Sequence, residues 1–428
     1  MIVIDLSSSG QPTVPQTSDM IKYAVLSAYG FSYVIFAFFI DRPAEIFNGI
    51  RTIISQTDKL ITDYFVVGGL GASFFNAGIL TLISILILYL QDINITGVSI
   101  AAIFLMSGFG LFGKNIFNVW PILLGVFIYS KVQKEKFSKY IYIALFGTSM
   151  APTISELIFI GDGASFQRFC LGIFIGGVIG FILPPLSTYL LRVHQGYNLY
   201  NVGFTAGIIT TVMVSLFKSY GFVTETRLIW YTDNSTALTI FLILLFSSMI
   251  VVGYYLNGRS FKNVKNVFSY SGRLITDFVL LEGFGVSLIN MGVNGFIGML
   301  YIIIVGGPLN GPTLGGIFTI VGFSAFGKHL KNIIPIFIGV LLGSMTKTWN
   351  INDPSILLVA LFGTGLAPIA GQFGWQYGIL AGFINSSVAL NVGVLHGGLN
   401  LYNTGFSAGI VAAFLIPIIE AFRKDVDL

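Results

Sequence analysis

The sequence has few charged residues, one cysteine and three histidines. Charged residues make up only 9% of its 428 positions, whereas a soluble domain carries about 25%. With 55% hydrophobic residues and a mean hydropathy of +0.86, a soluble globular domain is excluded. The single Cys170 excludes an internal disulfide and a cysteine metal cluster, and three histidines leave few ligands for zinc. We therefore expect a polytopic membrane protein without a cofactor or a bound metal.

The net charge of the chain further limits the binding partners that we expect. A net charge of +4 is small for a chain of this length and reflects basic loops, not a nucleic-acid surface. The N-terminus also lacks a basic segment before its first apolar run, so it is not a cleaved secretory signal. The expected partners are the lipid bilayer and a small solute or ion. A homo-oligomer is compatible with the sequence, and nucleic acid is not an expected partner.

One polar stretch occurs twice in this apolar chain. Residues His194–Gly207 read HQGYNLYNVGFTAG, and His396–Gly409 read HGGLNLYNTGFSAG, with ten of fourteen positions identical. Such self-similarity indicates an internal duplication. Polar groups at membrane depth are costly and usually belong to a binding site or a pore. We call these two stretches the signature elements.

Further matches extend the duplication over most of the chain. The LITD sequence at 60–63 recurs at 274–277, and the glycine-rich segment 69–78 recurs at 283–292. A Phe-Gly-Lys turn ending at Lys114 recurs at Lys328. We therefore predict a flexible tail at 1–20, a first membrane repeat at 21–234 and a second at 235–428.

Each repeat contains seven apolar runs. In the first copy they lie at 21–40, 62–90, 95–112, 116–129, 140–160, 169–191 and 199–217. This predicts an all-α fold with about fourteen transmembrane segments. The run at 62–90 is too long and too rich in glycine for one straight span, so a broken or re-entrant helix is expected there. The region 41–59 has isoleucines at helical spacing, which predicts an interfacial amphipathic helix.

An odd number of spans per copy predicts that the two repeats are inverted in the membrane. Loop charge supports this independently. The loops 131–139 and 258–273 are basic, whereas their counterparts 347–353 and 41–59 are nearly neutral. The positive-inside rule therefore places both basic loops in the cytoplasm and their counterparts on the other side.

The signature elements allow two interpretations of about equal weight. Their asparagines are good helix N-cap residues, which favours a structural role. Alternatively, amides and tyrosine hydroxyls at the start of two broken helices line a substrate path near the bilayer centre. The residues concerned are Asn198, Tyr200, Asn201, Asn400, Tyr402 and Asn403. Their neighbours His194 and His396 more often serve as caps than as catalysts.

The glycine-rich segments also allow two interpretations. They lie in membrane spans without a preceding strand, which argues against a dinucleotide-binding loop. Close helix packing by glycine is one interpretation. The other is a pore lining that exposes polar side chains. The side chains concerned are Ser73, Asn76, Ser287 and Asn290.

Three acidic residues are candidates for ion coupling. Asp63 and Asp277 each start a repeated segment, where an acid that complements the helix dipole is the default interpretation. A proton or sodium coupling site is the alternative. Glu156 lies inside an apolar run, and the equivalent position of the other copy is Gln372. This difference between the copies gives the asymmetry that a coupled transporter needs. Lys114 and Lys328 are interpreted as helix-end lysines that reach the interface.

These motifs resemble those of a known family. The duplicated NLYNxGFxAG element, the LITD start and the FGK turn are similar to an uncharacterised family of bacterial polytopic membrane proteins, known as a domain of unknown function. The resemblance implies a multi-pass protein of a bacterial inner membrane and no established activity. A weaker similarity is to urea transporters, whose glycine-rich elements stand in the same order as 71–78 and 196–207. That similarity implies a small-solute pore.

The sequence therefore predicts a channel or secondary transporter for a small polar solute or ion, with its path at the repeat interface. A membrane-embedded enzyme using His194, His396 or Glu156 is the runner-up. A non-transporting scaffold or receptor is the third candidate. We expect no enzyme, because catalysis predicts an asymmetric acid–base cluster, whereas the repeats mostly present equivalent pairs.

Overall fold

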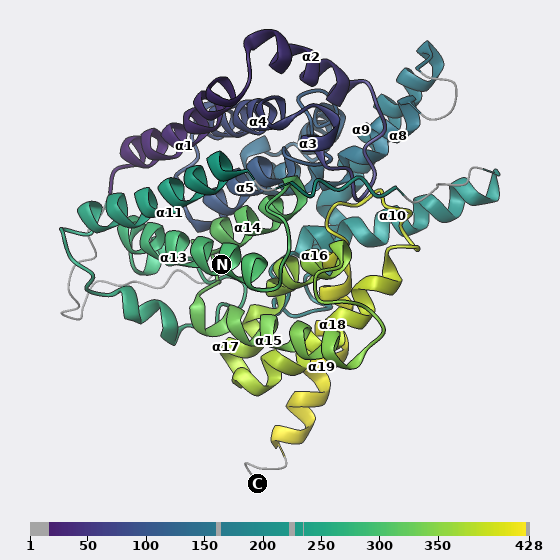
Figure 1. Cartoon of the computed structure of the whole chain (residues 1–428). Coiled ribbons are helices and arrows are strands. Elements are labelled where there is room, and N and C mark those ends of the chain that lie inside the picture. The colour runs from purple at the N-terminus through teal and green to yellow at the C-terminus, as the bar shows by residue number, and fades with distance from the viewer. Residues whose placement is uncertain (1–16, 160–163, 222–226, 234, 425–428) are drawn as a thin grey trace.

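The computed structural model describes residues 17–159, 164–221, 227–233 and 235–424 (Figure 1). Most of the predicted tail at 1–20 lies outside this part. The first helix begins at Asp19, inside that predicted tail. In Figure 1 the first copy, purple to teal, occupies the upper part of the view, and the second copy, green to yellow, occupies the lower part.

The described residues are almost entirely helical, as predicted. The first copy contains α1 (Asp19–Ile40), α2 (Pro43–Ile54), α3 (Tyr64–Val67), α4 (Leu70–Leu90), α5 (Gly97–Phe109), α6 (Trp120–Val132), α7 (Ile141–Gly147), α8 (Ala151–Phe159), α9 (Phe166–Leu190) and α10 (Asn201–Ser219). The second copy contains α11 (Thr236–Leu256), α12 (Phe278–Leu281), α13 (Phe284–Ile304), α14 (Gly311–Phe323), α15 (Leu330–Thr346), α16 (Pro354–Gly363), α17 (Ala367–Phe373), α18 (Trp375–Val392) and α19 (Asn403–Lys424). In the described ranges, extended backbone pairs only at two isolated bridges.

The predicted fourteen full spans are not confirmed. Nine helical segments of the described chain are long and apolar enough to cross a membrane. Four further apolar helices (α5, α6, α14 and α15) have only 13, 13, 13 and 17 residues. A straight span needs about 20 residues. The count of about fourteen therefore stays a prediction, since the 13-residue helices are shorter than a straight span.

The short helices form hairpins that return to the end they start from. The loop before α5, at Gln91–Ile93, lines the same hollow as Lys131 at the end of α6. In the second copy, Gly307 before α14 packs on Leu357, close to the start of α16. Each hairpin thus adds no net crossing. Its turn lies deep in the protein and carries a buried lysine, Lys114 or Lys328.

The predicted break in the run at 62–90 is confirmed. The four-residue α3 ends at Val67, and α4 starts at Leu70. Gly69 between them has φ +88°, and its counterpart Gly283 has φ +94°. Only glycine adopts this backbone region readily. The predicted helix after α1 is also present as α2, with Ile46, Ile50 and Ile53 buried on one face.

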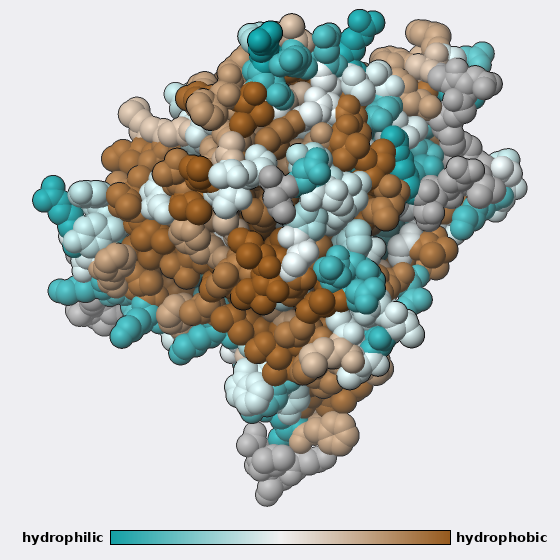
Figure 2. Space-filling view, in the orientation of Figure 1, coloured by the Kyte–Doolittle hydropathy of each residue, from teal (hydrophilic) through white to brown (hydrophobic). Residues whose placement is uncertain are grey.

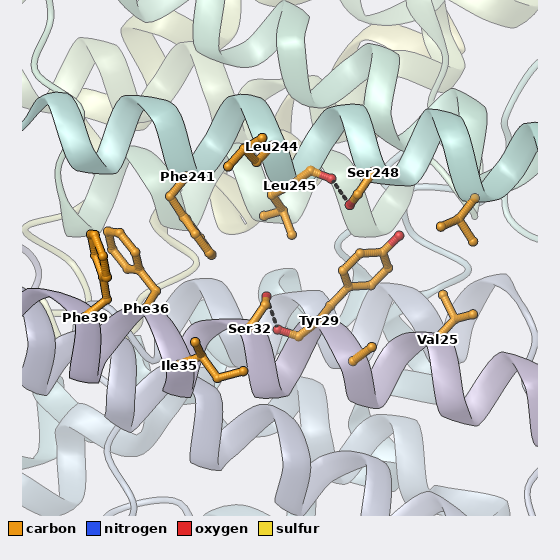
Figure 3. Close-up of a pocket in the computed structure, with 12 residues that line it drawn as sticks. Val25, Tyr29, Ser32, Ile35, Phe36, Phe39, Phe241, Leu244, Leu245 and Ser248 are labelled. Atoms are coloured by element: carbon orange, nitrogen blue, oxygen red, sulfur yellow. Dashed lines mark hydrogen bonds between the residues drawn. The ribbon is translucent and has the colours of Figure 1, made fainter.

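The first helices of the two copies, α1 and α11, lie side by side and run in opposite directions. Figure 3 shows Phe36 near Phe241 and, further along the pair, Tyr29 near Ser248. A groove of about 560 Å³ lies between them. Ten of its twelve lining residues form pairs separated by 216 residues, such as Ser32 with Ser248 and Tyr29 with Leu245. Each serine donates to a carbonyl one helical turn earlier.

This pairing agrees with the predicted inverted repeat, which stays a prediction. A two-fold rotation that exchanges helices running in opposite directions needs an axis perpendicular to them. The register of α1 against α11 is 216, two residues more than the offset of 214 that holds for the LITD and glycine-rich segments. In Figure 2, hydrophobic side chains cover the face over α1, α11 and α13, with hydrophilic groups along its margin. Such a surface suits the hydrocarbon core of a bilayer.

The half-helices α5 and α14 cross at the centre of the molecule. A Cβ added at Gly108 would lie 2.8 Å from the Gly315 oxygen, and one at Gly322 would lie 2.7 Å from the Phe104 Cβ. Glycine therefore permits the two helices to approach closely. The two copies meet at backbone distance here, so the interface between them forms the protein core.

Candidate functional site

The two signature elements form hydrogen bonds with each other. The Asn198 amide donates to the Gly405 oxygen at 2.9 Å, and the Asn400 amide donates to the Gly203 oxygen at 3.3 Å. The side-chain oxygen of each asparagine accepts the backbone N–H two residues later, from Tyr200 or Tyr402. Both amides therefore hold the start of α10 against the start of α19.

Asn201 and Asn403 also bond to backbone and histidine. Their amides donate to the Ser187 and Ala389 oxygens, each at 2.9 Å. Their oxygens lie 3.0 and 2.8 Å from the Nε2 atoms of His194 and His396. Because each asparagine oxygen can only accept, this contact requires that both imidazoles carry a proton at Nε2. The histidines thus fix the turn before each helix. A substrate contact by any of these four asparagines stays a prediction.

The polar residues of the glycine-rich segments hold the hairpin turns. The Asn76 amide donates to the oxygens of Gly110 and Lys114 at 2.6 and 2.8 Å. Asn290 donates likewise to Ser324 and Lys328, at 2.7 and 2.8 Å. Ser73 and Ser287 each donate to the carbonyl four residues earlier in the chain. A pore-lining role for these four residues is likewise untested.

The two buried lysines end a symmetric row of side chains through the centre. The row runs Lys114, Phe109, Tyr402, Tyr200, Phe323, Lys328. Neighbouring ring centroids lie 4.8, 4.9 and 5.0 Å apart, and the lysine nitrogens lie 4.9 and 5.3 Å from the outer phenylalanine rings. Each member has its counterpart in the other copy. The row is therefore symmetric in residue type about the contact between the two tyrosines.

The two halves of the row differ in their hydrogen bonds. The Lys328 ammonium donates to the Tyr200 hydroxyl and, at 2.7 Å, to Thr364 Oγ1. Among the described residues, Lys114 instead hydrogen-bonds only to the Met106 sulfur, at 3.4 Å, and the buried Tyr402 hydroxyl has no hydrogen-bond partner. Within the described ranges, neither lysine forms an ion pair with a carboxylate. The centre thus contains two buried amino groups without a counter-ion.

A cavity of about 330 Å³ reaches this row from one end of the molecule. Tyr200, Tyr402 and Phe323 form part of its wall, and Ile275 lies at its outer edge with 83% of its surface exposed. The equivalent Ile61 is only 6% exposed. The segment between the repeats covers it, since Arg227 and Ile229 pair with Ile61 through two backbone hydrogen bonds of 2.9 Å. One of the two equivalent approaches to the row is therefore closed by the linker.

Asp63 and Asp277 cap helices of the opposite copy. Asp63 accepts backbone N–H groups from Phe65 and Tyr231, and from Gly311 at the start of α14. Asp277 accepts from Val279 and Leu280, and from Gly97 at the start of α5 at 2.8 Å. A carboxylate at a helix N-terminus is favourable. The geometry gives each acid a capping role across the repeat interface, and their role in ion coupling is untested.

The third candidate, Glu156, belongs to a buried polar group present only in the first copy. Its Oε1 lies 2.7 Å from the Lys59 ammonium. The neighbouring Asp58 is fully buried and accepts three side-chain hydrogen bonds. Burial raises the pKa of Asp58 to about 7, while hydrogen bonds and the distant Arg227 lower it. Sequence reasoning missed Asp58 because it lies just after α2, in a region interpreted as interfacial.

The central lysines were interpreted from the sequence as surface groups that reach the interface, and the structure contradicts this. Lys114 and Lys328 are both 0% exposed. The available signal was their repetition: a lysine at equivalent positions of two apolar copies serves a purpose common to both halves. The predicted tyrosine pair is brought together, with ring centroids 4.9 Å apart.

Comparison with known proteins agrees with the duplication. A family profile described as a protein of unknown function (DUF1576) matches the chain twice, over residues 42–219 and 256–421. The chain belongs to this family. The prediction of an uncharacterised, internally duplicated membrane family is thereby confirmed. No curated protein and no solved structure matches the chain. The similarity to urea transporters and the bacterial origin therefore remain predictions.

Proposed function

We propose that this protein is a secondary transporter that carries a small anion across the membrane, along a path at the interface of two inverted repeats. The buried row from Lys114 to Lys328 is the observation that supports this most. A buried amino group without a counter-ion is unfavourable unless it is neutralised. An anion passing the row would supply the missing charge to either lysine.

The arrangement of helices supports the inverted repeat. The equivalent helices α1 and α11 are antiparallel. With each hairpin returning to its own side, the first copy keeps five of the nine span-length segments and the second copy keeps four. Counting the 18-residue α18 as a span gives five in each copy, again an odd number, which favours the inversion. Hairpin turns and broken helices that meet at the centre are typical of substrate sites in such transporters.

The asymmetric access supports a transporter over an open channel. The approach beside Ile275 contains the cavity, whereas the approach beside Ile61 is covered by the linker. The cavity is lined by α7, which follows the basic loop 131–139, and by Leu274, which follows the basic loop 258–273. It is also lined by Val98 near the start of α5, and the loop before α5 lies beside Lys131 of the first basic loop. We therefore assign its opening to the cytoplasmic side. Transport would require the cover at Ile61 to open while the other side closes.

The test is flux through the purified protein in liposomes. The probes are chloride, nitrate, formate, acetate and phosphate, with urea and glycerol as neutral solutes. We expect flux of at least one anion and none of the neutral solutes. Lys114→Met and Lys328→Met should each reduce that flux about tenfold or more, since about 1.4 kcal/mol of lost attraction gives a factor of ten.

Lys131→Met is the matched control, because Lys131 is exposed at the end of α6. It should leave the flux unchanged. Neutral solutes that cross as fast as anions would contradict the assigned substrate class. Unchanged anion flux in both central variants, at matched protein level, would remove the row from the path.

A further inference from the structure

The buried polar group of the first copy lies beside the turn that carries Lys114. Asp58 is its centre. Its Oδ2 accepts hydrogen bonds from the Asn115 amide at 3.0 Å, the Asn118 amide at 3.2 Å and the Ser155 hydroxyl at 2.8 Å. Three donors on one oxygen favour a charged carboxylate at that atom.

The other oxygen of Asp58 has weaker support. Asp58 Oδ1 and the Tyr64 hydroxyl are both buried, and neither makes a hydrogen bond of full geometry among the described residues. The Tyr64 hydroxyl still acts on the Asp58 carboxylate as a donor and lowers its pKa. Lys59 lies 2.7 Å from Glu156. Arg227 acts on Asp58 only through space and binds Thr57 and Gln56. Among the described residues, Asp58 therefore forms no ion pair, and a bound cation or a proton would neutralise it.

The surroundings fit a proton better than a metal cation. Hard cations require several oxygen ligands. Asn115 and Asn118 instead direct their NH₂ groups at Asp58, because their oxygens already accept backbone N–H groups of the same turn. The Lys59 ammonium repels a second cation. No cluster of three metal-ligating side chains occurs in the part of the chain that the structure describes.

In the second copy, backbone atoms occupy the equivalent space. Gly272 stands where the first copy has Asp58, and Gly371 stands where it has Ser155. A Cβ at Gly272 would lie 2.0 Å from the Gly327 oxygen, and one at Gly371 would lie 2.1 Å from the Ser271 oxygen. An acid therefore fits only in the first copy. The asymmetry separates this group from the paired residues of the central row.

We infer that Asp58 is a proton-binding site, and that its proton travels with the anion in the transport cycle. The proton joins Oδ1, forms an O–H bond there and converts the carboxylate to a neutral acid. Asn118 links this step to the central row, because its amide donates both to Asp58 and to the Gly113 oxygen, next to Lys114. The coupling rests on the proposed anion transport, whereas the proton site itself does not.

The raised pKa is consistent with this assignment. Burial brings the pKa of Asp58 to about 7, so protonated and ionised forms are both populated near neutral pH. A group that exchanges protons in a transport cycle needs this property.

The proton site is tested without any substrate. Infrared spectra of the purified protein between pH 5.5 and 8.5 should show buried carboxyl C=O absorption that disappears with a midpoint near neutral pH. Asp63 contributes to it as well, because burial raises the pKa of Asp63 to about 7. Asp58→Asn should therefore remove one component of the absorption, and the exposed control Asp233→Asn should remove none. Ser155→Ala removes one donor from the carboxylate, so it should raise the midpoint of the Asp58 component by about one pH unit. Undiminished absorption in Asp58→Asn, or an unmoved midpoint in Ser155→Ala, would overturn the site.

The coupling is tested with the anion that shows flux. A gradient of one pH unit should drive about tenfold accumulation per coupled proton. Asp58→Asn should lose this accumulation and keep exchange of labelled for unlabelled anion. Accumulation that survives in Asp58→Asn, or that follows a sodium gradient instead, would overturn the coupling. Absence of all anion flux alongside an intact infrared titration would refute the transport function and leave the proton site standing.

Discussion

The reciprocal caps at Asp63 and Asp277 give the sharpest test of how the two repeats are held together. Asp63→Asn keeps the size of the side chain and one oxygen. That oxygen can still accept the N–H groups of Phe65 and Gly311, now without the charge. The new amide NH₂ then faces the N–H of Tyr231, which loses its acceptor.

The cost follows from these three bonds. A hydrogen bond to a charged group contributes about 1.5–3 kcal/mol, and an unsatisfied buried N–H costs about 1–3 kcal/mol. We expect Asp63→Asn to lower the free energy of unfolding by about 3 kcal/mol at pH 8. This corresponds to a fall of at least about 5 °C in melting temperature in detergent. Asp277→Asn should behave alike, because it removes the cap of α5 in the same manner.

Asp233→Asn is the matched control, since Asp233 is exposed and lies two residues from the Tyr231 that Asp63 binds. It should melt as the unchanged protein does. If Asp63→Asn also melted like this control while anion flux collapsed, the capping argument would be refuted. Ion coupling at Asp63 would then be the better interpretation.

Four further predictions concern packing, the hairpin turns, pH and topology. Gly207→Ala places a Cβ 2.2 Å from the Phe406 ring and should destabilise the protein by about 1–3 kcal/mol. The control Gly177→Ala meets nothing within 4 Å and should leave the stability unchanged. Equal melting temperatures of the two variants would contradict the α10–α19 contact. Asn290→Ser removes two bonds to the Lys328 turn, so stability and flux should fall together, while Asn391→Ser on an exposed helix face serves as control. Because the folded pKa of Asp58 lies above its unfolded value, the folded state binds the proton more tightly, so Asp58 contributes a fall in melting temperature as pH rises from about 4 to 7. Asp58→Asn should remove this contribution, so the melting temperature of the variant relative to the unchanged protein should rise over that pH range. A cysteine at Lys265 in a Cys170→Ser background should resist labelling from outside intact cells, and external labelling there would reverse the topology.

Some of the fold was readable from sequence because it depends on composition and repetition. The break at Gly69 was predictable, since a run of that length with clustered glycine cannot form one straight span. The number of crossings was not predictable by counting runs. The lengths of α5 and α6 alone do not say whether the turn at Lys114 leaves the membrane or stays inside it.

The candidate site shows the same division. Repetition identified Tyr200 and Tyr402, and the structure places their rings 4.9 Å apart. Their asparagine neighbours were equally conspicuous in sequence, yet their amides bind backbone carbonyls of the facing copy. Residue type cannot distinguish an amide that holds a turn from one that faces a substrate, because the distinction lies in which groups are near.

The sequence by itself determined that this is a duplicated, all-helical membrane protein, because hydropathy and self-similarity are properties of the chain and need no contacts. Tertiary structure alone decided where the charges lie. Lys114 and Lys328 look like surface lysines in sequence and become buried only because each hairpin folds back into the protein. Asp58 becomes a buried acid only because the turn at Asn115–Asn118 and the helix at Ser155 close around it. Burial depends on segments far apart in the chain, and it turns ordinary ionisable side chains into a candidate transport site.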